Sequence, residues 1–163
     1  MARLVLTDAS PLIALTRVDG VDWLRSLFGT VEMTRAVRRE LGRAGSLEPQ
    51  LEQALDQGWL VARANDPEGP GCPPHLGDGE WTTLLAAREH DGDTLVLVDD
   101  SLARREARRL GLEVAGTAAV VGAAARHELI PSAREVFERL LQSDFRISAT
   151  VIRAVLDRLD REG

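Results

Sequence analysis

The sequence predicts an α/β fold with a mostly parallel central sheet, and two observations lead to this prediction. Short apolar segments typical of strands alternate with segments of helical periodicity along the chain. Two of the strand-like segments, at residues 4–7 and 94–98, run directly into an acidic residue that is followed by a helix start. The 163 residues show no internal repeat and suffice for one domain with a sizeable core.

Composition narrows the class of protein. The net charge of -6 argues against broad nonspecific binding to phosphate backbones. Cys72 is the only cysteine, which excludes intramolecular disulfides and cysteine-based zinc sites. No apolar run reaches the roughly 18 residues of a membrane span. Met1 to Arg3 lead straight into the first expected strand, so we expect no signal peptide and a cytoplasmic protein without a membrane partner.

The first third of the chain carries clear helix-start and helix-stop residues. Ser10 followed by Pro11 predicts a helix start, because serine caps free amides and proline suits the first turn. Asp22 and Thr34 are expected to cap the next two helices, and Gly29 ends the first of these. The expected elements are a strand at 4–7, a helix from 10, a helix over 22–28, an extended piece at 31–33 and a helix over 36–41.

The remaining chain continues the alternation after one irregular loop. Residues 65–77 contain four of the seven prolines and three glycines, which predicts a loop without regular structure. The expected elements are helices over 47–57, 78–91, 102–110, 117 onward, 133–141 and 148–159, with strands at 59–62, 94–98 and 112–115. Because the last helix has apolar residues at helical spacing, it can pack on the domain or on a partner.

Acidic residues recur at positions where parallel strands end and helices begin. Asp8 follows the first strand, and Asp99 and Asp100 follow the strand at 94–98. Carboxyl ends of parallel strands share one sheet edge, where ligands bind. Glu40 lies beside an apolar helix face, and Glu80 lies in the first turn of a helix. Clustered carboxylates are typical ligands of hard divalent cations, so the pattern predicts a metal site.

Each of these acids also has a purely structural interpretation. Asp8 can satisfy backbone amides in a turn, and Glu40 can be a solvated helix residue. Asp78 and Glu80 can cap their helix or favour its dipole. These alternatives remain open from the sequence.

Other polar residues flank the expected cleft. Ser10 and Thr117 lie at helix starts, where they can orient water or phosphate or simply act as caps. Arg104 and Arg108 lie one turn apart after the last acids, as do Arg105 and Arg109. This stripe suits phosphate binding, and it equally suits a solvated face paired with acids such as Glu106.

Four motifs together resemble the PIN-domain nucleases. They are LTDASPLIAL at 6–15, LGDGE at 76–80, LVDDSLARREARRLGLEVAGT at 97–117 and DFRIS at 144–148. They are most similar to a branch of small prokaryotic PIN-like proteins of the DUF3368 type, related to VapC-type toxins. The resemblance covers nearly the whole chain and implies a three-layer α/β/α fold over 1–163, with 144–163 as a C-terminal helical extension.

The resemblance also assigns roles to the acids. Asp8 matches the first acid of the family, Glu40 the second, Glu80 the third, and Asp99 or Asp100 the last. This cluster is expected to bind Mg²⁺ or Mn²⁺ and to cleave RNA through a metal-activated water. The branch often carries a further acid where this chain has Thr82, and that departure puts a second metal site in doubt.

The function implied is a metal-dependent endoribonuclease resembling a VapC-type toxin, with an RNA substrate, a cognate antitoxin protein and a homodimeric state. One alternative is a catalytically silent PIN-like module that binds RNA or protein, which Thr82 and the acidic net charge favour. Another is a metal-dependent phosphatase on a different acidic α/β fold, for which the doubled Asp99-Asp100 gives little support.

Overall fold

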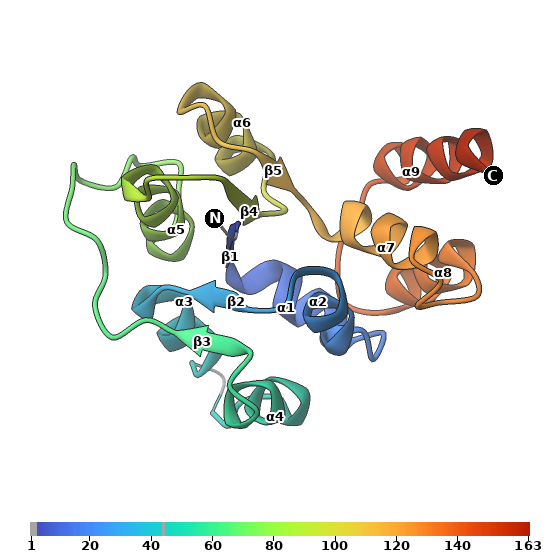
Figure 1. Cartoon of the computed structure of the whole chain (residues 1–163), viewed down its shortest axis with the longest axis horizontal. Helices are drawn as coiled ribbons and strands as arrows, with labels where there is room; N and C mark the ends of the chain where they lie inside the picture. Colours follow the sequence, from blue (N-terminus) through green and yellow to red (C-terminus); the bar gives the residue numbers. More distant parts are fainter. Residues whose placement is uncertain (1–2, 44) are drawn as a thin grey trace.

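The computed structural model describes residues 3–43 and 45–163, and its described part contains one five-stranded parallel sheet (Figure 1). The strand order is β3-β2-β1-β4-β5, and all four strand pairs are parallel. The strands are β1 (Leu4–Thr7), β2 (Val31–Met33), β3 (Leu60–Ala62), β4 (Thr94–Leu97) and β5 (Val114–Ala115). The predicted parallel sheet is therefore confirmed. Met1 and Ala2, which entered the expectation about a signal peptide, lie outside the described residues.

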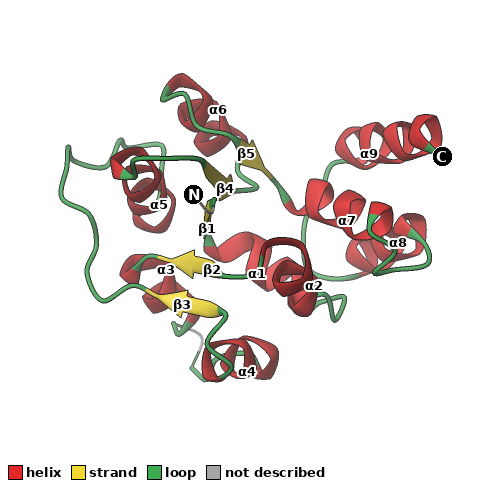
Figure 2. Cartoon of the chain, in the orientation of Figure 1, coloured by secondary structure: helices red, strands yellow, loops and turns green. Residues whose placement is uncertain are grey.

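Helices connect the strands and cover both faces of the sheet (Figure 2). They are α1 (Ala9–Thr16), α2 (Val21–Phe28), α3 (Arg35–Leu41), α4 (Pro49–Asp56), α5 (Asp78–Glu89), α6 (Ser101–Arg109), α7 (Thr117–Arg126), α8 (Ala133–Gln142) and α9 (Ala149–Glu162). Their bounds agree with the expected ranges to within a few residues. The three-layer α/β/α arrangement is confirmed.

The two central strands divide the apolar residues between two cores. Leu4 and Leu6 of β1 pack with α5 and α6 on one face, whereas Val5 packs with the remaining helices on the other. The same alternation holds in β4, where Val96 and Leu97 face opposite cores. Successive side chains of a strand point to opposite faces, so a strand buried on both sides is apolar at every position.

The starts of α1, α2 and α7 differ from the expected caps. Asp8 has extended backbone angles and is itself the N-cap of α1, so Ser10 lies inside the helix and does not cap it. Gly116 takes the N-cap position of α7 in place of Thr117, and Gly20 that of α2 in place of Asp22. The Thr34 cap is confirmed, because its hydroxyl oxygen accepts a hydrogen bond from the Val37 N–H at 3.2 Å.

The irregular loop before α5 is confirmed, and α5 holds it in place. The indole Nε1–H of Trp81 donates to the carbonyl oxygen of Pro70 at 2.8 Å. Leu76 is buried in the core formed with α5 and α6, and Gly69 lies against the side chain of Leu85. The loop therefore has defined contacts at three points although it lacks regular structure.

The C-terminal helix packs on the chain itself. Ile152 of α9 is buried, and Val155 lies so close to Gly122 of α7 that a Cβ there would stand 2.8 Å from its Cγ1 atom. Gly122 therefore allows the two helices to approach. Within the described residues, no helix has both the length and the apolar character needed to cross a membrane.

The first prediction concerns the double-sided core. Leu6 is fully buried whereas Leu141 is 56% exposed, so Leu6→Ala should lower the free energy of unfolding by about 2–5 kcal/mol and Leu141→Ala by less than about 0.5 kcal/mol. Urea unfolding followed by circular dichroism measures both. Equal effects of the two substitutions would contradict the assigned core.

Candidate functional site

The register of the two central strands brings their carboxyl ends to one level. Thr7 pairs with Leu97, and the Asp8 N–H donates to the Leu97 carbonyl oxygen at 2.9 Å. In the sheet, β2 lies on one side of β1, and β4, which comes later in the sequence, lies on the other side of β1. In open α/β sheets this point of reversal leaves a crevice outside the strand ends. Asp8 and Asp99 stand at that crevice.

A cavity of about 280 Å³ opens at this edge of the sheet. It is lined by Asp8, Ala9, Ser10, Ile13, Glu40, Gly77 and Glu80. Asp8 lies at its base and is only 6% exposed, whereas Glu40 is exposed at the rim and Glu80 is half-buried. Three of the predicted acids thus share one pocket: Asp8 follows β1, Glu40 lies on α3 and Glu80 lies on α5.

Asp8 is the most perturbed acid of this pocket. Its Oδ1 atom is buried and has no hydrogen-bond partner. Burial, together with the nearby carboxylates of Glu80, Glu40 and Asp99, raises the pKa of Asp8 to about 7, against a smaller opposing effect of the Ala9 N–H. An ionised Asp8 is therefore costly unless a cation reaches the pocket.

Gly79 makes this crowding possible. A Cβ at this position would stand 2.6 Å from Glu40 Oε2, 3.2 Å from Asp8 Oδ1 and 3.3 Å from a methyl carbon of Val37. Two carboxylate oxygens from different elements therefore lie against the same bare backbone position in α5. Any side chain here would displace at least one of them.

Glu80 has a structural contact and also faces the pocket. Its Oε1 atom accepts a hydrogen bond from the Gly77 N–H at 2.8 Å, as in a capping box. Burial, and then the carboxylates of Asp100 and Glu40, raise the pKa of Glu80. The proposed cap role of Asp78 is wrong, because Gly77 occupies the N-cap position and Asp78 is the first helical residue.

Asp99 is held in place by the start of α7. Its Oδ1 atom accepts from the Thr117 N–H at 2.7 Å, and its Oδ2 atom accepts from the Thr117 hydroxyl at 2.7 Å. The Ser10 hydroxyl also donates to Oδ2, at 3.3 Å. Ser10 and Thr117 therefore orient an acid of the crevice, which is a different role from the caps considered above.

Asp100 has a different environment from its neighbour. It is exposed and is the N-cap of α6, where its Oδ2 atom accepts from the Ala103 N–H at 2.9 Å. Its carboxylate acts on the pKa of Glu80, whereas that of Asp99 acts on Asp8. The two adjacent aspartates thus face different parts of the acidic cluster.

The acids share the crevice without forming a closed ligand shell. Across residues 3–43 and 45–163, no three Asp, Glu, His or Cys side chains are grouped tightly enough to hold a metal ion as they stand. The donor set nevertheless fits a hard divalent cation, because every donor is a carboxylate oxygen and Asp8 Oδ1 lacks any partner.

The arginines beside the crevice differ in their contacts. Arg104 is half-buried, and its Nη1 atom and Asp99 Oδ1 both lie within 3.0 Å of the position of a Cβ on Gly116. Arg108, one turn further along α6, is exposed. Arg109 is paired with Glu106, whose Oε2 atom accepts from its Nε–H at 3.0 Å. The arginine stripe on α6 thus begins at the acidic cluster and extends to the surface.

Thr82, which replaces an acid often found in the resembling family, has a structural role. Its hydroxyl donates to the carbonyl oxygen of Asp78 at 2.8 Å and lies 2.8 Å from the hydroxyl of Thr34. The contact joins the N-terminal part of α5 to the cap of α3. The helices that carry Glu80 and Glu40 are therefore tied together by two hydroxyl groups.

Gly79 and Gly116 are the residues of the site that the sequence analysis missed. Each stands directly beside a predicted site residue, in the strings Asp78-Gly79-Glu80 and Gly116-Thr117. A glycine next to a candidate ligand is a signal of close approach. Their partners come from distant parts of the chain, so the sequence did not show what they accommodate.

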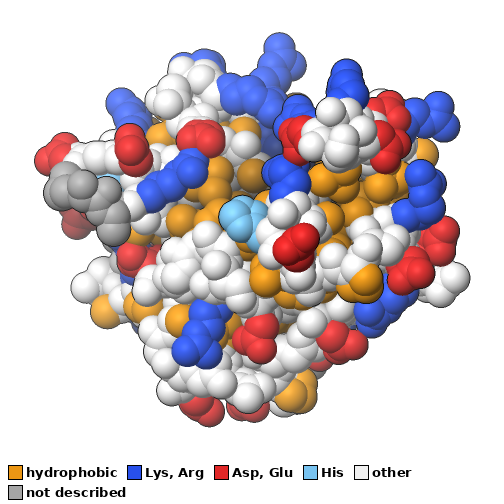
Figure 3. All heavy atoms as spheres, turned by 45° about the vertical axis from the view of Figure 1, so that its right-hand side comes forward, with side chains coloured by type: hydrophobic (Ala, Val, Ile, Leu, Met, Phe, Trp, Pro, Cys, Tyr) orange, Lys and Arg blue, Asp and Glu red, His pale blue; other side chains and the backbone are white. Residues whose placement is uncertain are grey.

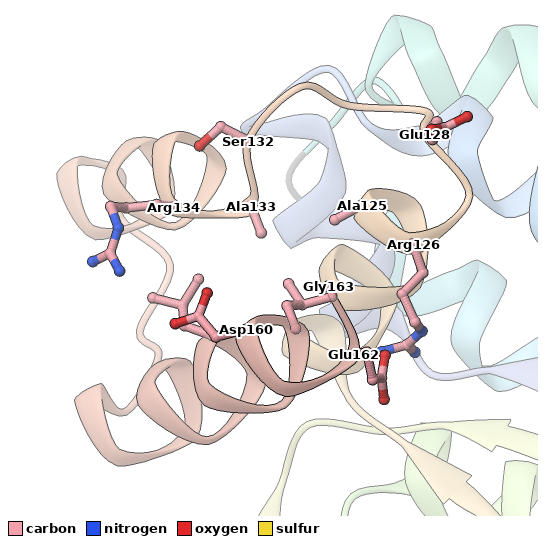
Figure 4. A pocket seen from close by; sticks show the side chains of 11 residues that line it. Ala125, Arg126, Glu128, Ser132, Ala133, Arg134, Asp160, Glu162 and Gly163 are labelled. Carbon is pink, nitrogen blue, oxygen red and sulfur yellow. The ribbon is translucent and has the colours of Figure 1, made fainter.

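A larger cavity lies away from the acidic cluster of Asp8, Glu40, Glu80 and Asp99, between α7, α8 and α9 (Figure 4). It measures about 790 Å³ and contains none of the predicted site residues. Arg126 and Glu162 form an ion pair of 3.6 Å at its edge. Figure 3 brings this side of the molecule forward and shows basic and acidic side chains interspersed with hydrophobic ones. The cavity is lined by both basic side chains (Arg126, Arg134) and acidic ones (Glu128, Asp160, Glu162), so its charge does not favour a ligand of one sign.

Comparisons with known proteins agree with this architecture. The DUF3368 family model, described as a PIN domain, matches residues 4–161. A PilT N-terminus domain protein from the hyperthermophilic archaeon Sulfolobus solfataricus P2 has a similar solved structure, with a TM-score of 0.53 and 16% sequence identity over 89% of this chain and 99% of that chain. At this identity the likeness concerns the fold alone. No curated protein matches the chain significantly.

The raised pKa of Asp8 predicts a specific dependence of stability on pH. Its carboxyl ionises near pH 3.8 when the chain is unfolded and near pH 7 when it is folded. In EDTA, the free energy of unfolding should therefore fall as the pH rises from 4 to 8, by on the order of 4 kcal/mol from this group. Asp8→Asn should remove this component, as measured by urea unfolding at several pH values.

A matched control is Asp91→Asn, which changes an exposed acid before β4. It should retain the pH dependence of the wild type. The same slope in Asp8→Asn as in the wild type would show that Asp8 ionises normally in the folded protein.

Proposed function

This chain belongs to the DUF3368 family of PIN domains, and on that basis we propose that it is a metal-dependent endoribonuclease that hydrolyses RNA phosphodiester bonds. PIN domains are typically nucleases and generally use divalent metals. The observation that carries the proposal is the buried Asp8, whose Oδ1 atom has no partner in a pocket shared with Glu40 and Glu80. Such a group is costly by itself and favourable next to a cation.

The proposed ligands of Mg²⁺ or Mn²⁺ are Asp8, Glu40, Glu80 and Asp99. Asp100, whose carboxylate acts on the pKa of Glu80, is a further proposed ligand. When bound, the metal supplies a water of lowered pKa and stabilises negative charge on the phosphate oxygens. No histidine or cysteine nucleophile is required for this reaction class.

The protein's own contribution is to hold the carboxylates in place. Thr117 and Ser10 fix the carboxylate of Asp99 by hydrogen bonds, so its orientation is set by the start of α7. The Gly77 N–H fixes one oxygen of Glu80, and Gly79 leaves room for Asp8 and Glu40. Ligands that are oriented by further hydrogen bonds bind metal more tightly than free side chains.

The substrate and partners follow from the same proposal. Arg104 and Arg108 run from the acidic cluster along α6 and suit the phosphates of an RNA strand. A VapC-type toxin role, a cognate antitoxin protein and a homodimer complete the proposal. The cavity between α7, α8 and α9 shares no lining residue with the pocket of Asp8, Glu40 and Glu80.

A second candidate function is a silent PIN-like module that binds RNA or protein without cleavage. Two observations favour it: Thr82 replaces an acid of the resembling branch, and the acids do not form a closed ligand group in the described part of the chain. Metal uptake separates the two candidates, because only the nuclease requires it.

The deciding experiment is calorimetric titration with Mn²⁺, combined with an RNA cleavage assay. We expect saturable Mn²⁺ binding and Mn²⁺-dependent cleavage in the wild type, and a loss of both of at least about 100-fold in Asp8→Asn, because a charged ligand is removed. Asp91→Asn should behave as the wild type. A folded wild type that takes up no Mn²⁺ would instead support the silent module.

A second substitution tests the role of the crowded glycine. Gly79→Ala should displace the flexible end of Glu40 and weaken Mn²⁺ binding about tenfold. The added Cβ would also crowd Asp8 Oδ1 and the buried Val37, so we expect the free energy of unfolding to fall by about 1–2 kcal/mol after the helix preference of alanine offsets part of the crowding. Gly71→Ala is the control, since no atom lies within 4 Å of its added Cβ. Unchanged Mn²⁺ affinity in Gly79→Ala would mean that Glu40 is no ligand.

A further inference from the structure

Arg104 is a half-buried arginine beside the acidic cluster that makes no bond to it. Its Nε atom is buried and has no hydrogen-bond partner. Within the described residues, no acid forms an ion pair with its guanidinium. A buried donor without a partner costs free energy, and few such donors occur in folded proteins. The position of Arg104 is therefore not explained by a local ion pair or hydrogen bond.

Gly116 brings Arg104 and Asp99 to the same point. An added Cβ on this glycine would stand 3.0 Å from Arg104 Nη1 and 2.9 Å from Asp99 Oδ1. The two atoms are therefore no more than about 6 Å apart, a range over which opposite charges in a protein still attract each other. Gly116 is also the N-cap of α7, and the positive end of a helix repels a guanidinium. The carboxylate of Asp99 lies at the same point and offsets that repulsion.

Hydrogen bonds keep the Asp99 carboxylate in place beside Arg104. Its two oxygens accept from the N–H and the hydroxyl of Thr117, both at 2.7 Å. In the part of the chain that the structure describes, no hydrogen bond joins Asp99 to Arg104, so the guanidinium acts on the cluster through its charge alone. None of the described residues that line the pocket of Asp8, Glu40 and Glu80 is basic. Arg104 thus places a positive charge next to a group of carboxylates that has none in its own pocket.

We propose that Arg104 is a positioning residue of the acidic cluster: its guanidinium is the resident counter-charge of the metal-free protein and opposes a divalent cation that binds there. This inference rests on the proposed function, because the cation is the proposed Mg²⁺ or Mn²⁺. An RNA phosphate on Arg104 offsets its charge, so metal and substrate bind cooperatively. Arg104 thereby keeps the affinity for free metal low until RNA is present.

The test is calorimetric titration of Mn²⁺, without RNA, into the wild type, Arg104→Gln and Arg104→Lys. Arg104→Gln should lower the Kd of Mn²⁺ about tenfold, because one repulsive charge is removed. Arg104→Lys keeps a positive charge, and Arg104 Nε has no partner among the described residues that lysine would lose, so its Kd should stay within about threefold of the wild type. A purely structural role of Arg104 predicts the opposite sign, which is weaker Mn²⁺ binding in Arg104→Gln.

The matched control is Arg88→Gln. It removes the same charge from an exposed residue in the last turn of α5, at the opposite end of that helix from Glu80. Water and salt screen an exposed charge at this distance, so the Kd of Mn²⁺ should stay within about twofold of the wild type.

Thermal unfolding in EDTA tests the counter-charge without any metal. Arg104→Gln should lower the Tm by about 3 °C relative to Arg104→Lys, because the carboxylates lose the charge that offsets their repulsion. Saturating Mn²⁺ should then raise the Tm more in Arg104→Gln than in the wild type, since tighter binding stabilises the folded state more. Equal Tm values of the two variants in EDTA would overturn the counter-charge whatever the metal titration gives.

Failure of this inference and failure of the nuclease give different results. Mn²⁺ uptake by the wild type with equal or weaker uptake by Arg104→Gln would retain the proposed metal site and overturn the role of Arg104. Mn²⁺ uptake by Arg104→Gln alone would support the role of Arg104 and, for the wild type, the silent module. Where neither protein takes up Mn²⁺, the nuclease is overturned and the Tm comparison in EDTA decides on Arg104.

Discussion

The whole site depends on the parallel pairing of β1 and β4. Because Thr7 lies opposite Leu97, the next residues, Asp8 and the Asp99 that follows Val98, leave the sheet side by side. The strands are buried on both faces, so the carboxylate at the end of β1 stands on top of the apolar core. A shift of one residue in this register would turn the alternating core residues to the wrong faces. The core that stabilises the fold therefore also fixes the acids.

Helix starts explain how this cluster exists before any cation arrives. Asp8 is the N-cap of α1, Glu80 lies in the first turn of α5, and Asp100 is the N-cap of α6. Asp99 accepts the first free N–H of α7. The positive ends of four helices thus converge on four carboxylates and offset part of their repulsion. Glu40 is the exception, because it lies near the end of α3 and is exposed. A position at a helix start and the proposed ligand role are therefore compatible for these four acids.

The sequence predicted the parts of the structure that depend on local pattern. The strands before Asp8 and Asp99, the irregular loop and the Thr34 cap follow from periodicity and turn chemistry within a few residues. The sequence left Ser10 and Thr117 as caps or as groups that orient water or phosphate, because a local pattern cannot show that Asp99, 89 and 18 residues away, is their partner. The role of Gly79 was invisible for the same reason: the atoms that it makes room for belong to other elements.

The distribution of charge is compatible with the proposal that this acidic protein acts on RNA, a polyanion. A net charge of -6 gives RNA no general attraction to the surface, so affinity has to come from local contacts. The nine residues of α6 carry four of the chain's 20 basic side chains, directly after Asp99 and Asp100. A cation in the crevice would offset part of the acidic charge at the same place. An RNA strand that lay between the cation and α6 would then meet positive charge on both sides. The acidic residues elsewhere on the surface would disfavour RNA binding at other positions.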